Sequence, residues 1–223
     1  MIFPIGDTQV QGGYKPIFSY TFIVINIIVF LYEVSLQSGL GEFITTYGVI
    51  PQEIVSGVDY YTLFTSMFLH GGWMHLIGNM LFLWVFADNI EAIVGSFKFV
   101  VFYVLGGLAA SAAHIFFNME SSIPSVGASG AIAAVLGAYI VMFPKSQIKI
   151  HVIILFRNFN ISALLFLGIW FVQQFVSGIG SIGVRTTESS GVAWWAHIGG
   201  FVFGVIFGFL FKNAVIDHQG KSN

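Results

Sequence analysis

Long apolar stretches alternate with short polar ones along most of this chain. Six of the stretches approach or reach the length of a membrane-spanning helix, which takes roughly 20 residues, or about 17 at the short end. Pro16 precedes the first stretch, Pro144 follows the fourth and Lys212 ends the sixth, which are ordinary helix boundaries. The six stretches are residues 17–36, 73–94, 97–117, 127–143, 160–178 and 193–212. The pattern therefore predicts an all-α fold, a bundle of six transmembrane helices.

The basic residues predict how this bundle is oriented in the membrane. Lys and Arg in short loops favour the cytoplasmic side. Seven of the eight fall on one side of the predicted bundle, and only Arg185 falls on the other. The seven are Lys15, Lys98, Lys145, Lys149, Arg157, Lys212 and Lys221. We therefore expect a plasma-membrane protein with both termini in the cytoplasm, and with the second, fourth and sixth helices beginning at the outer face.

The six helices leave no room for a second folded domain in the 223 residues. We expect a cytoplasmic tail at 1–16, a six-helix domain at 17–212 and a second cytoplasmic tail at 213–223. Residues 1–7 have no basic or long apolar segment, so no cleavable signal peptide is expected.

The connections between the helices differ in character. The loop at 37–72 carries acidic and aromatic residues but no Lys or Arg. It is predicted to lie in the outer membrane interface as short amphipathic pieces, although an ordinary extracellular loop fits about as well. Residues 151–156 are apolar but too short to span, and are interpreted as a cytoplasmic connection. Residues 179–192, rich in Gly, Ser and Thr, are interpreted as a mobile outer loop.

Composition supports the membrane assignment and excludes several chemistries. Hydrophobic residues make up 57% of the chain and charged residues 8%, with a mean hydropathy of +0.88, whereas soluble domains carry about 25% charged residues. The net charge of −2 gives no reason to expect nucleic acid. The absence of cysteine removes disulfides, thiol nucleophiles and Cys-ligated metals. No cofactor and no metal ion are expected.

Five polar side chains share one depth near the outer face. They are His75, Asn79, His114, Ser129 and His197. Polar groups in membrane helices are costly and tend to face the bundle interior or a water-filled cavity. His75 and Asn79 also share one helix face, because four residues separate them. The shared depth suggests a polar site inside the bundle.

Small residues suggest which helices meet at this site. One stripe on the sixth helix is Ala196, Gly200, Gly204 and Gly208, and one on the fourth is Ser129, Ala133 and Gly137. Such stripes let two helix backbones approach closely. His197 borders the first stripe, so packing of the two helices would bring Ser129 and His197 together.

A serine and a histidine in contact would form a catalytic pair, with His197 as general base and Ser129 as nucleophile. The fourth helix is short, so its start is expected to lie below the outer surface, where water can gather. The Ser129 N–H, with Asn79 and His75, could then hold the oxyanion. Because no carboxylate lies near this depth in the second, fourth or sixth helix, a dyad is expected rather than a triad.

Each of these residues also has a common structural role. A serine in a membrane helix usually bonds its own backbone, and a histidine or asparagine usually links two helices. The residue pattern alone leaves the catalytic and structural interpretations about equally supported.

Three motifs resemble the rhomboid intramembrane serine proteases, over residues 17–212. The motifs are His70-Gly-Gly-Trp-Met-His75-Leu-Ile-Gly-Asn79-Met, Gly127-Ala-Ser129-Gly and Ala196-His197-Ile-Gly-Gly. The resemblance implies that Ser129 is the nucleophile and His197 the base, with Asn79, His75 and the Ser129 amide serving the oxyanion. It further implies substrates that are single-span membrane proteins, cut near the outer face where the helix can unwind, usually after a small residue.

The resemblance also implies that the loop before the second helix partly enters the membrane, and that the fifth-helix region and an outer cap gate substrate entry. Two positions depart from the family pattern. Thr62 stands where an arginine is common, which puts the anchoring of the loop in doubt, and Ala133 stands where some members stack an aromatic ring on the histidine. His197 would then be oriented differently, for example by an aromatic residue of another helix.

Two other functions compete with the protease. One is an inactive rhomboid-like protein that binds transmembrane segments, which the presence of both Ser129 and His197 disfavours. The other is a transporter or metal-ion channel with His75, His114 and His197 as ligands, which the distance of the carboxylates from the midplane disfavours. Membrane lipid and transmembrane proteins are the expected partners, and the oligomeric state is open.

Overall fold

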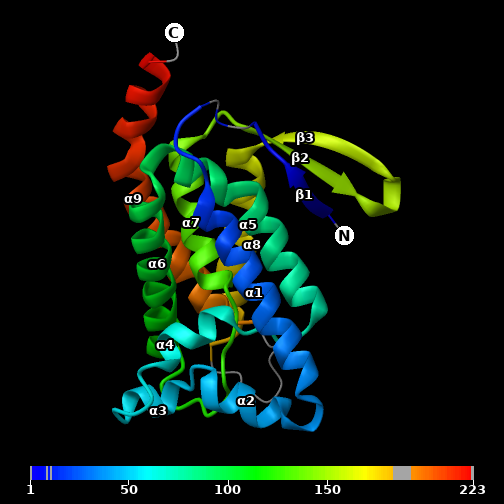
Figure 1. The fold of residues 1–223 in the computed structure, drawn as a ribbon, viewed down its shortest axis with the longest axis vertical. Helices are drawn as coiled ribbons and strands as arrows, with labels where there is room; N and C mark the ends of the chain where they lie inside the picture. The colour runs from blue at the N-terminus through cyan, green and yellow to red at the C-terminus, as the bar shows by residue number, and fades with distance from the viewer. Residues whose placement is uncertain (1, 9, 11, 183–191, 222–223) are drawn as a thin grey trace.

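A computed structural model describes residues 2–8, 10, 12–182 and 192–221, and most of them are helical. Figure 1 shows a bundle of helices along one long axis, with both termini at the same end. The bundle helices are α1 (Ile17–Ser35), α5 (Trp73–Val94), α6 (Ser96–Phe117), α7 (Ser129–Met142), α8 (Ala163–Gly180) and α9 (Trp194–Lys221). The predicted all-α, polytopic fold is confirmed.

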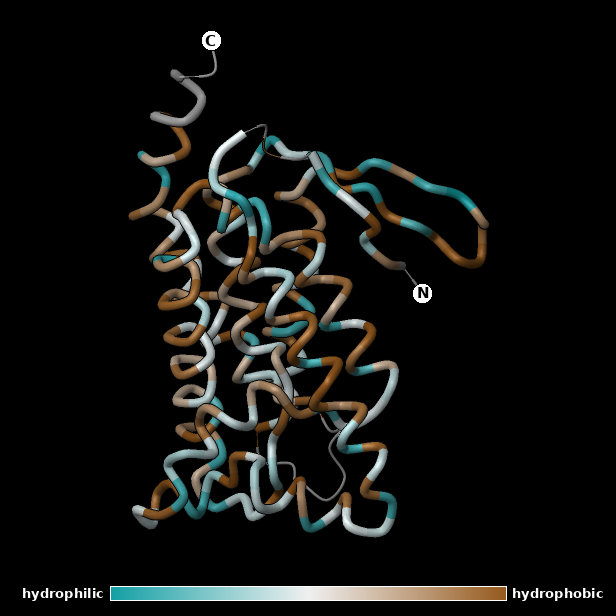
Figure 2. The backbone as a smooth tube through the Cα atoms, viewed as in Figure 1, coloured by the Kyte–Doolittle hydropathy of each residue, from teal (hydrophilic) through white to brown (hydrophobic). Residues whose placement is uncertain are grey.

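Among the described residues, five helices are long and apolar enough to cross a membrane: α1, α5, α6, α8 and α9. Figure 2 shows apolar residues along most of the length of these helices that lies within the bundle. The remaining bundle helix, α7, has 14 residues, so it is about 21 Å long and shorter than the hydrocarbon layer. It begins at Ser129 rather than at the predicted residue 127, and most of its side chains are buried. A short, central α7 places its first residue inside the bundle.

The close approach of α7 and α9 confirms the packing predicted from their small residues. A Cβ atom on Gly200 would overlap the carbonyl oxygen of Gly130, and one on Gly204 would overlap the carbonyl oxygen of Ala134. Because neither position has space for a side chain, the two backbones are in direct contact. This contact fixes the position of each helix along the axis of the other.

The long loop before α5 folds into short helices, and its place in the membrane interface stays a prediction. They are η1 (Gln37–Gly39), α2 (Leu40–Tyr47), α3 (Pro51–Val55), α4 (Thr62–Thr65) and η2 (Ser66–Phe68). The Tyr61 hydroxyl donates to the carbonyl of Thr46 at 2.9 Å, and the Thr65 hydroxyl donates to that of Tyr47 at 2.7 Å. Thr62 is buried, and its hydroxyl donates to the carbonyl of Asp59 at 2.7 Å. Hydroxyl-to-backbone bonds thus hold this loop, although no arginine stands at position 62.

A three-stranded antiparallel sheet at the end of the bundle was not predicted. It consists of β1 (Ile2–Gly6), β2 (Gln147–Val152) and β3 (Arg157–Ser162), in that order, with a short turn, η3 (Ile153–Leu155), between the last two. Residues 2–6, expected in a tail, pair with β2, and 151–156 belong to a hairpin. The predicted helix at 160–178 begins later, at Ala163, because the Ser162 hydroxyl caps it by accepting from the N–H of Leu165.

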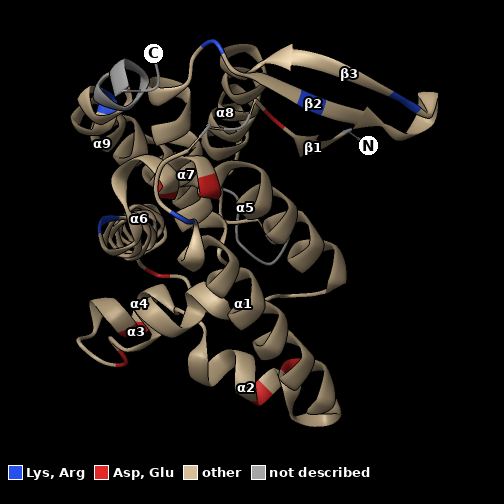
Figure 3. Cartoon of the chain, turned by 45° about the horizontal axis from the view of Figure 1, so that its top comes forward, with Lys and Arg blue, Asp and Glu red and all other residues tan. Residues whose placement is uncertain are grey.

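The charged residues separate along the bundle. Figure 3 shows Lys and Arg gathered at the end that carries the sheet and both termini, while most of the acidic residues lie toward the other end.

Glu91, in the last turn of α5, accepts hydrogen bonds from the N–H and hydroxyl of Ser19, both at 2.7 Å, and from the Ser96 hydroxyl at 2.6 Å. One buried carboxylate therefore joins the starts of α1 and α6 to α5. Which side of the membrane carries the basic end stays a prediction, and most of the outer loop expected at 179–192 falls outside the described residues.

Substituting Gly204 by alanine should destabilise the protein by about 1–3 kcal/mol, because the new methyl group would push α9 away from the carbonyl of Ala134. Thermal unfolding in detergent should show a melting temperature several degrees below that of the parent. Gly168→Ala on α8 is the matched control, since a Cβ there meets nothing within 4 Å. Equal melting temperatures for Gly204→Ala and the parent would contradict the packing.

Candidate active site

Ser129 and His197 lie in hydrogen-bonding contact inside the bundle. The Nε2 atom of His197 is 2.8 Å from the Oγ atom of Ser129. Ser129 is the first residue of α7, and His197 lies in the first turn of α9. Their meeting follows from the contact of the two backbones one turn further along, where Gly200 packs on Gly130. The predicted proximity of these two side chains is confirmed.

Gln174 of α8 orients the His197 ring, and sequence reasoning missed it. The Oε1 atom of Gln174 is 2.7 Å from Nδ1 of His197. Because an amide oxygen only accepts, Nδ1 must carry the ring proton, which leaves Nε2 of neutral His197 free to accept from Ser129. Gln174 is buried. A buried glutamine in a membrane helix is costly, which is the signal that could have found it.

An aromatic ring also packs beside His197. The sequence led us to expect such a ring from another helix, because Ala133 of α7 is not aromatic. The Trp170 ring of α8 has its centroid 5.8 Å from that of His197, with 35° between the planes. Ala133 is fully buried against α9, where a Cβ on Gly200 would be 3.3 Å from its methyl group. An aromatic residue at position 133 would have no room. In this chain α8 therefore supplies the aromatic ring that Ala133 led us to expect from another helix.

His75 faces the start of α7 across Gly127. The backbone N–H of Gly71 donates to Nδ1 of His75 at 3.3 Å, so Nε2 of the neutral ring carries the proton. A Cβ atom on Gly127 would lie 2.8 Å from this Nε2 and 3.5 Å from Oγ of Ser129. Gly127 also has a φ of +133°, a conformation that other residues rarely adopt. The His75 N–H and the Ser129 hydroxyl therefore border the same small space.

Asn79 is held by a chain of hydrogen bonds that begins on α1. Glu33, buried near the end of α1, accepts from the backbone N–H of His70 at 3.1 and 3.3 Å. The Nε2 atom of His70 lies 3.0 Å from Nδ2 of Asn79. Burial, and then the nearby His75 ring, lower the pKa of His70 to about 3, so its neutral ring accepts from one amide hydrogen. The second amide hydrogen of Asn79 stays available to another acceptor.

A cavity of about 580 Å³ connects these groups. Its lining includes His75, Asn79, Ser129 and His197. His114, the fifth polar residue at this depth, also borders the cavity. Its Nδ1 atom lies 3.4 Å from Nδ2 of Asn118, one turn further along at the end of α6. Within the described ranges, no three His, Cys, Asp or Glu side chains are grouped so as to hold a metal ion.

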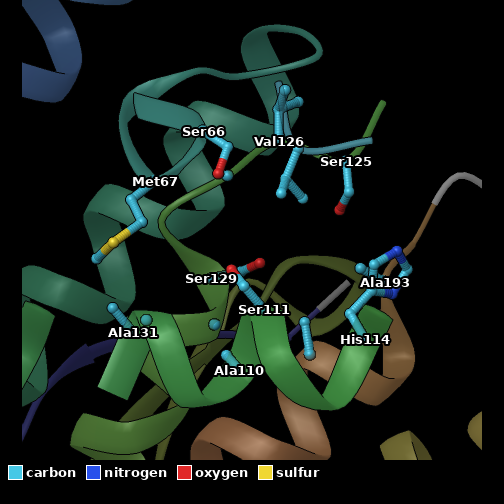
Figure 4. A pocket seen from close by; sticks show the side chains of 15 residues that line it. Ser66, Met67, Ala110, Ser111, His114, Ser125, Val126, Ser129, Ala131 and Ala193 are labelled. Atoms are coloured by element: carbon cyan, nitrogen blue, oxygen red, sulfur yellow. The ribbon is translucent and has the colours of Figure 1, made fainter. Parts of the chain in front are cut away.

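A second, smaller space lies directly beside Ser129. It has a volume of about 30 Å³, enough for roughly one or two water-sized groups. Figure 4 shows Ser129 at the centre of the side chains that line it, with Ser66 and Met67 from the loop before α5 on one side and Ser111 of α6 on another. A serine hydroxyl in contact with a histidine nitrogen, with N–H donors and a small space beside them, is an arrangement in which acyl transfer is chemically possible.

Comparison with known proteins shows the family. The Rhomboid domain model matches residues 58–214. The chain is 32% identical to the rhomboid protease GluP of Bacillus subtilis, covering 78% of this chain and 33% of that protein. It is 26% identical to the mitochondrial rhomboid protein 1 of Saccharomyces cerevisiae, covering 88% of this chain and 54% of that protein. The chain thus spans between a third and about half the length of these relatives. It belongs to the rhomboid family.

Proposed function

We propose that this protein is an intramembrane serine endopeptidase that cleaves transmembrane segments of membrane proteins near the outer face. The observation that carries the proposal is the 2.8 Å contact between Oγ of Ser129 and Nε2 of His197, with Nδ1 of the same ring held by Gln174. A serine hydroxyl is a weak nucleophile unless a base takes its proton. The contact with the Gln174 oxygen favours the tautomer with the proton on Nδ1, which leaves Nε2 able to accept the serine proton.

In the proposed reaction, His197 takes the hydroxyl proton as Ser129 attacks the carbonyl carbon of the scissile bond. The resulting oxyanion is held by the Ser129 backbone N–H, with the Nε2–H of His75 and the free amide hydrogen of Asn79 as side-chain donors. The N-terminus of α7 adds favourable charge, since the first N–H groups of a helix have no partner within it. His197 then gives its proton to the leaving amine, and a water hydrolyses the acyl-enzyme by the same route.

The space around the site supports the proposed class of substrate. Helical peptide bonds are shielded, so a transmembrane segment must unwind before Ser129 can reach it. The 580 Å³ cavity would admit a few residues of extended chain and the water for hydrolysis. The 30 Å³ space beside Ser129 would accept a small side chain, such as alanine, before the scissile bond. With both termini in the cytoplasm of a plasma-membrane protein, the cavity would open to the outer face.

Ser129→Ala and His197→Ala should each abolish cleavage, with kcat reduced by roughly 10⁴-fold or more, because the variants lack the nucleophile or the base. The assay is release of a labelled fragment from a single-span substrate, with alanine before the expected cleavage site, in proteoliposomes. Ser35→Ala at the exposed end of α1 is the matched control. Retained cleavage in Ser129→Ala, or none in the folded parent on any such substrate, would favour a protein that binds transmembrane segments without cutting them.

Gln174→Leu should lower kcat by roughly 10- to 100-fold with little change in KM, because the His197 ring would lose the partner that fixes its tautomer. Gln174→Glu keeps an acceptor at this position and should restore most of the rate. The neighbouring Gln173→Leu, exposed on the same helix, serves as control. Equal kcat values for the two leucine variants would rule out a positioning role.

A further inference from the structure

The hairpin formed by β2 and β3 has one apolar and one polar face. Antiparallel pairing puts Ile150 opposite Phe159 and Ile148 opposite Ile161, while Lys149 pairs with Asn160. Directly opposed residues point to the same side of a sheet, and side chains alternate along each strand. The first two pairs therefore share an apolar face, and Lys149 and Asn160 lie on the other face.

The apolar face continues beyond the part of the sheet that the helices cover. Ile148 and Ile150 are buried and belong to the hydrophobic core, so near its base this face points toward the bundle. Phe159, further out on the same face, is 43% exposed. Figure 1 shows the hairpin extending sideways from the basic end of the bundle, across the direction of the helices. Its outer half thus presents apolar side chains on the side where lipid surrounds the helices.

The tip of the hairpin is a run of exposed apolar residues. Ile154 is 80% exposed and Phe156 is 84% exposed, and their neighbours Ile153 and Leu155 are also exposed. Phe156 has a φ of +47°, a conformation uncommon for a bulky residue, and it lies in the turn between β2 and β3. Water is a poor environment for such a run, and exposed apolar groups of this kind mark interaction sites.

The charge of the hairpin is positive only. Residues 145–162 contain Lys145, Lys149 and Arg157 and no Asp or Glu. Arg157 pairs with Val152 at the outer end of the apolar face. From there its aliphatic stem can lie along apolar surface while the guanidinium reaches outward, as arginines do at membrane interfaces. A guanidinium is well suited to bind phosphate.

We propose that the β2–β3 hairpin is an interfacial membrane anchor. Its apolar tip, Ile153 to Phe156, inserts into the leaflet at the basic end of the bundle, and Arg157 binds the phosphates of anionic lipids there. The occupant of this surface is lipid, because apolar side chains beside positive charge, held level with the end of a membrane-spanning bundle, match a headgroup interface. The anchor does not depend on the proposed protease activity. It would hold β2 and the strand β1 paired with it against the membrane surface.

The chain contains no cysteine, so a single introduced cysteine reports on one position. Phe156→Cys, and Ile154→Cys as a second tip position, would each carry an environment-sensitive fluorophore in the full-length protein. Asn160→Cys on the polar face is the matched control. The proteins are reconstituted in nanodiscs of phosphatidylcholine alone, or with phosphatidylglycerol at about one lipid in three, with or without a lipid-attached quencher.

Both tip labels should emit at shorter wavelength than the Asn160 label and be quenched by the lipid-attached quencher, while the Asn160 label is not. The quenching should rise when phosphatidylglycerol is present, and Arg157→Gln should remove that rise. Thermal unfolding confirms that each labelled protein is folded. Tip labels that behave like the Asn160 label, accessible to a water-soluble quencher in both lipids, would overturn the anchor. Quenching that is indifferent to phosphatidylglycerol would overturn the role of Arg157.

Discussion

The direct contact between the backbones of α7 and α9 is the constraint on which the rest of the site depends. A side chain at Gly200 or Gly204 would separate the two helices, and Ser129 and His197 lie at the N-terminal ends of the two helices, beside this contact. In lipid no hydrophobic effect drives helices together, so van der Waals packing of small residues is what holds such a pair. The glycines of α9 therefore serve a geometric purpose, setting the distance across which a proton could pass.

The polar groups around this contact are held by specific partners, since an unpaired polar group is costly inside a membrane protein. Gln174 holds the His197 ring, Gly71 holds the His75 ring, and His70 holds Asn79. Each bond uses one atom of its residue and leaves another atom directed at the cavity or at Ser129. In the proposed protease, the site would thereby be organised before a substrate arrives, which is what stabilisation of a developing charge requires.

The sequence was enough to predict the helices, the shortness of α7 and the contact of Ser129 with His197. These predictions depend on the length of apolar stretches, on stripes of small residues and on the shared depth of polar residues, all of which can be seen within single helices. Sequence reasoning did not reach the sheet. β1 pairs with β2, and α1 to α7 lie between these two strands in the chain. β2 and β3 do alternate polar and apolar residues, but each has only six residues, and the apolar run at 151–156 was interpreted as a separate connection. Nor did sequence reasoning reach Gln174, whose role depends on how α8 crosses α9. Because Ala133 stands where some family members carry an aromatic residue, a ring beside His197 was expected from another helix, and Trp170 of α8 supplies it.

The central claim is that Ser129 is an activated nucleophile and His197 activates it. The most direct measurement is labelling of the detergent-solubilised protein with a fluorophosphonate probe, followed by mass spectrometry of the modified peptide, for the parent, Ser129→Ala and His197→Ala. The account predicts a phosphonylated Ser129 in the parent and no labelling in either variant. Labelling that persists in a folded Ser129→Ala protein, or is absent from the folded parent, would contradict it.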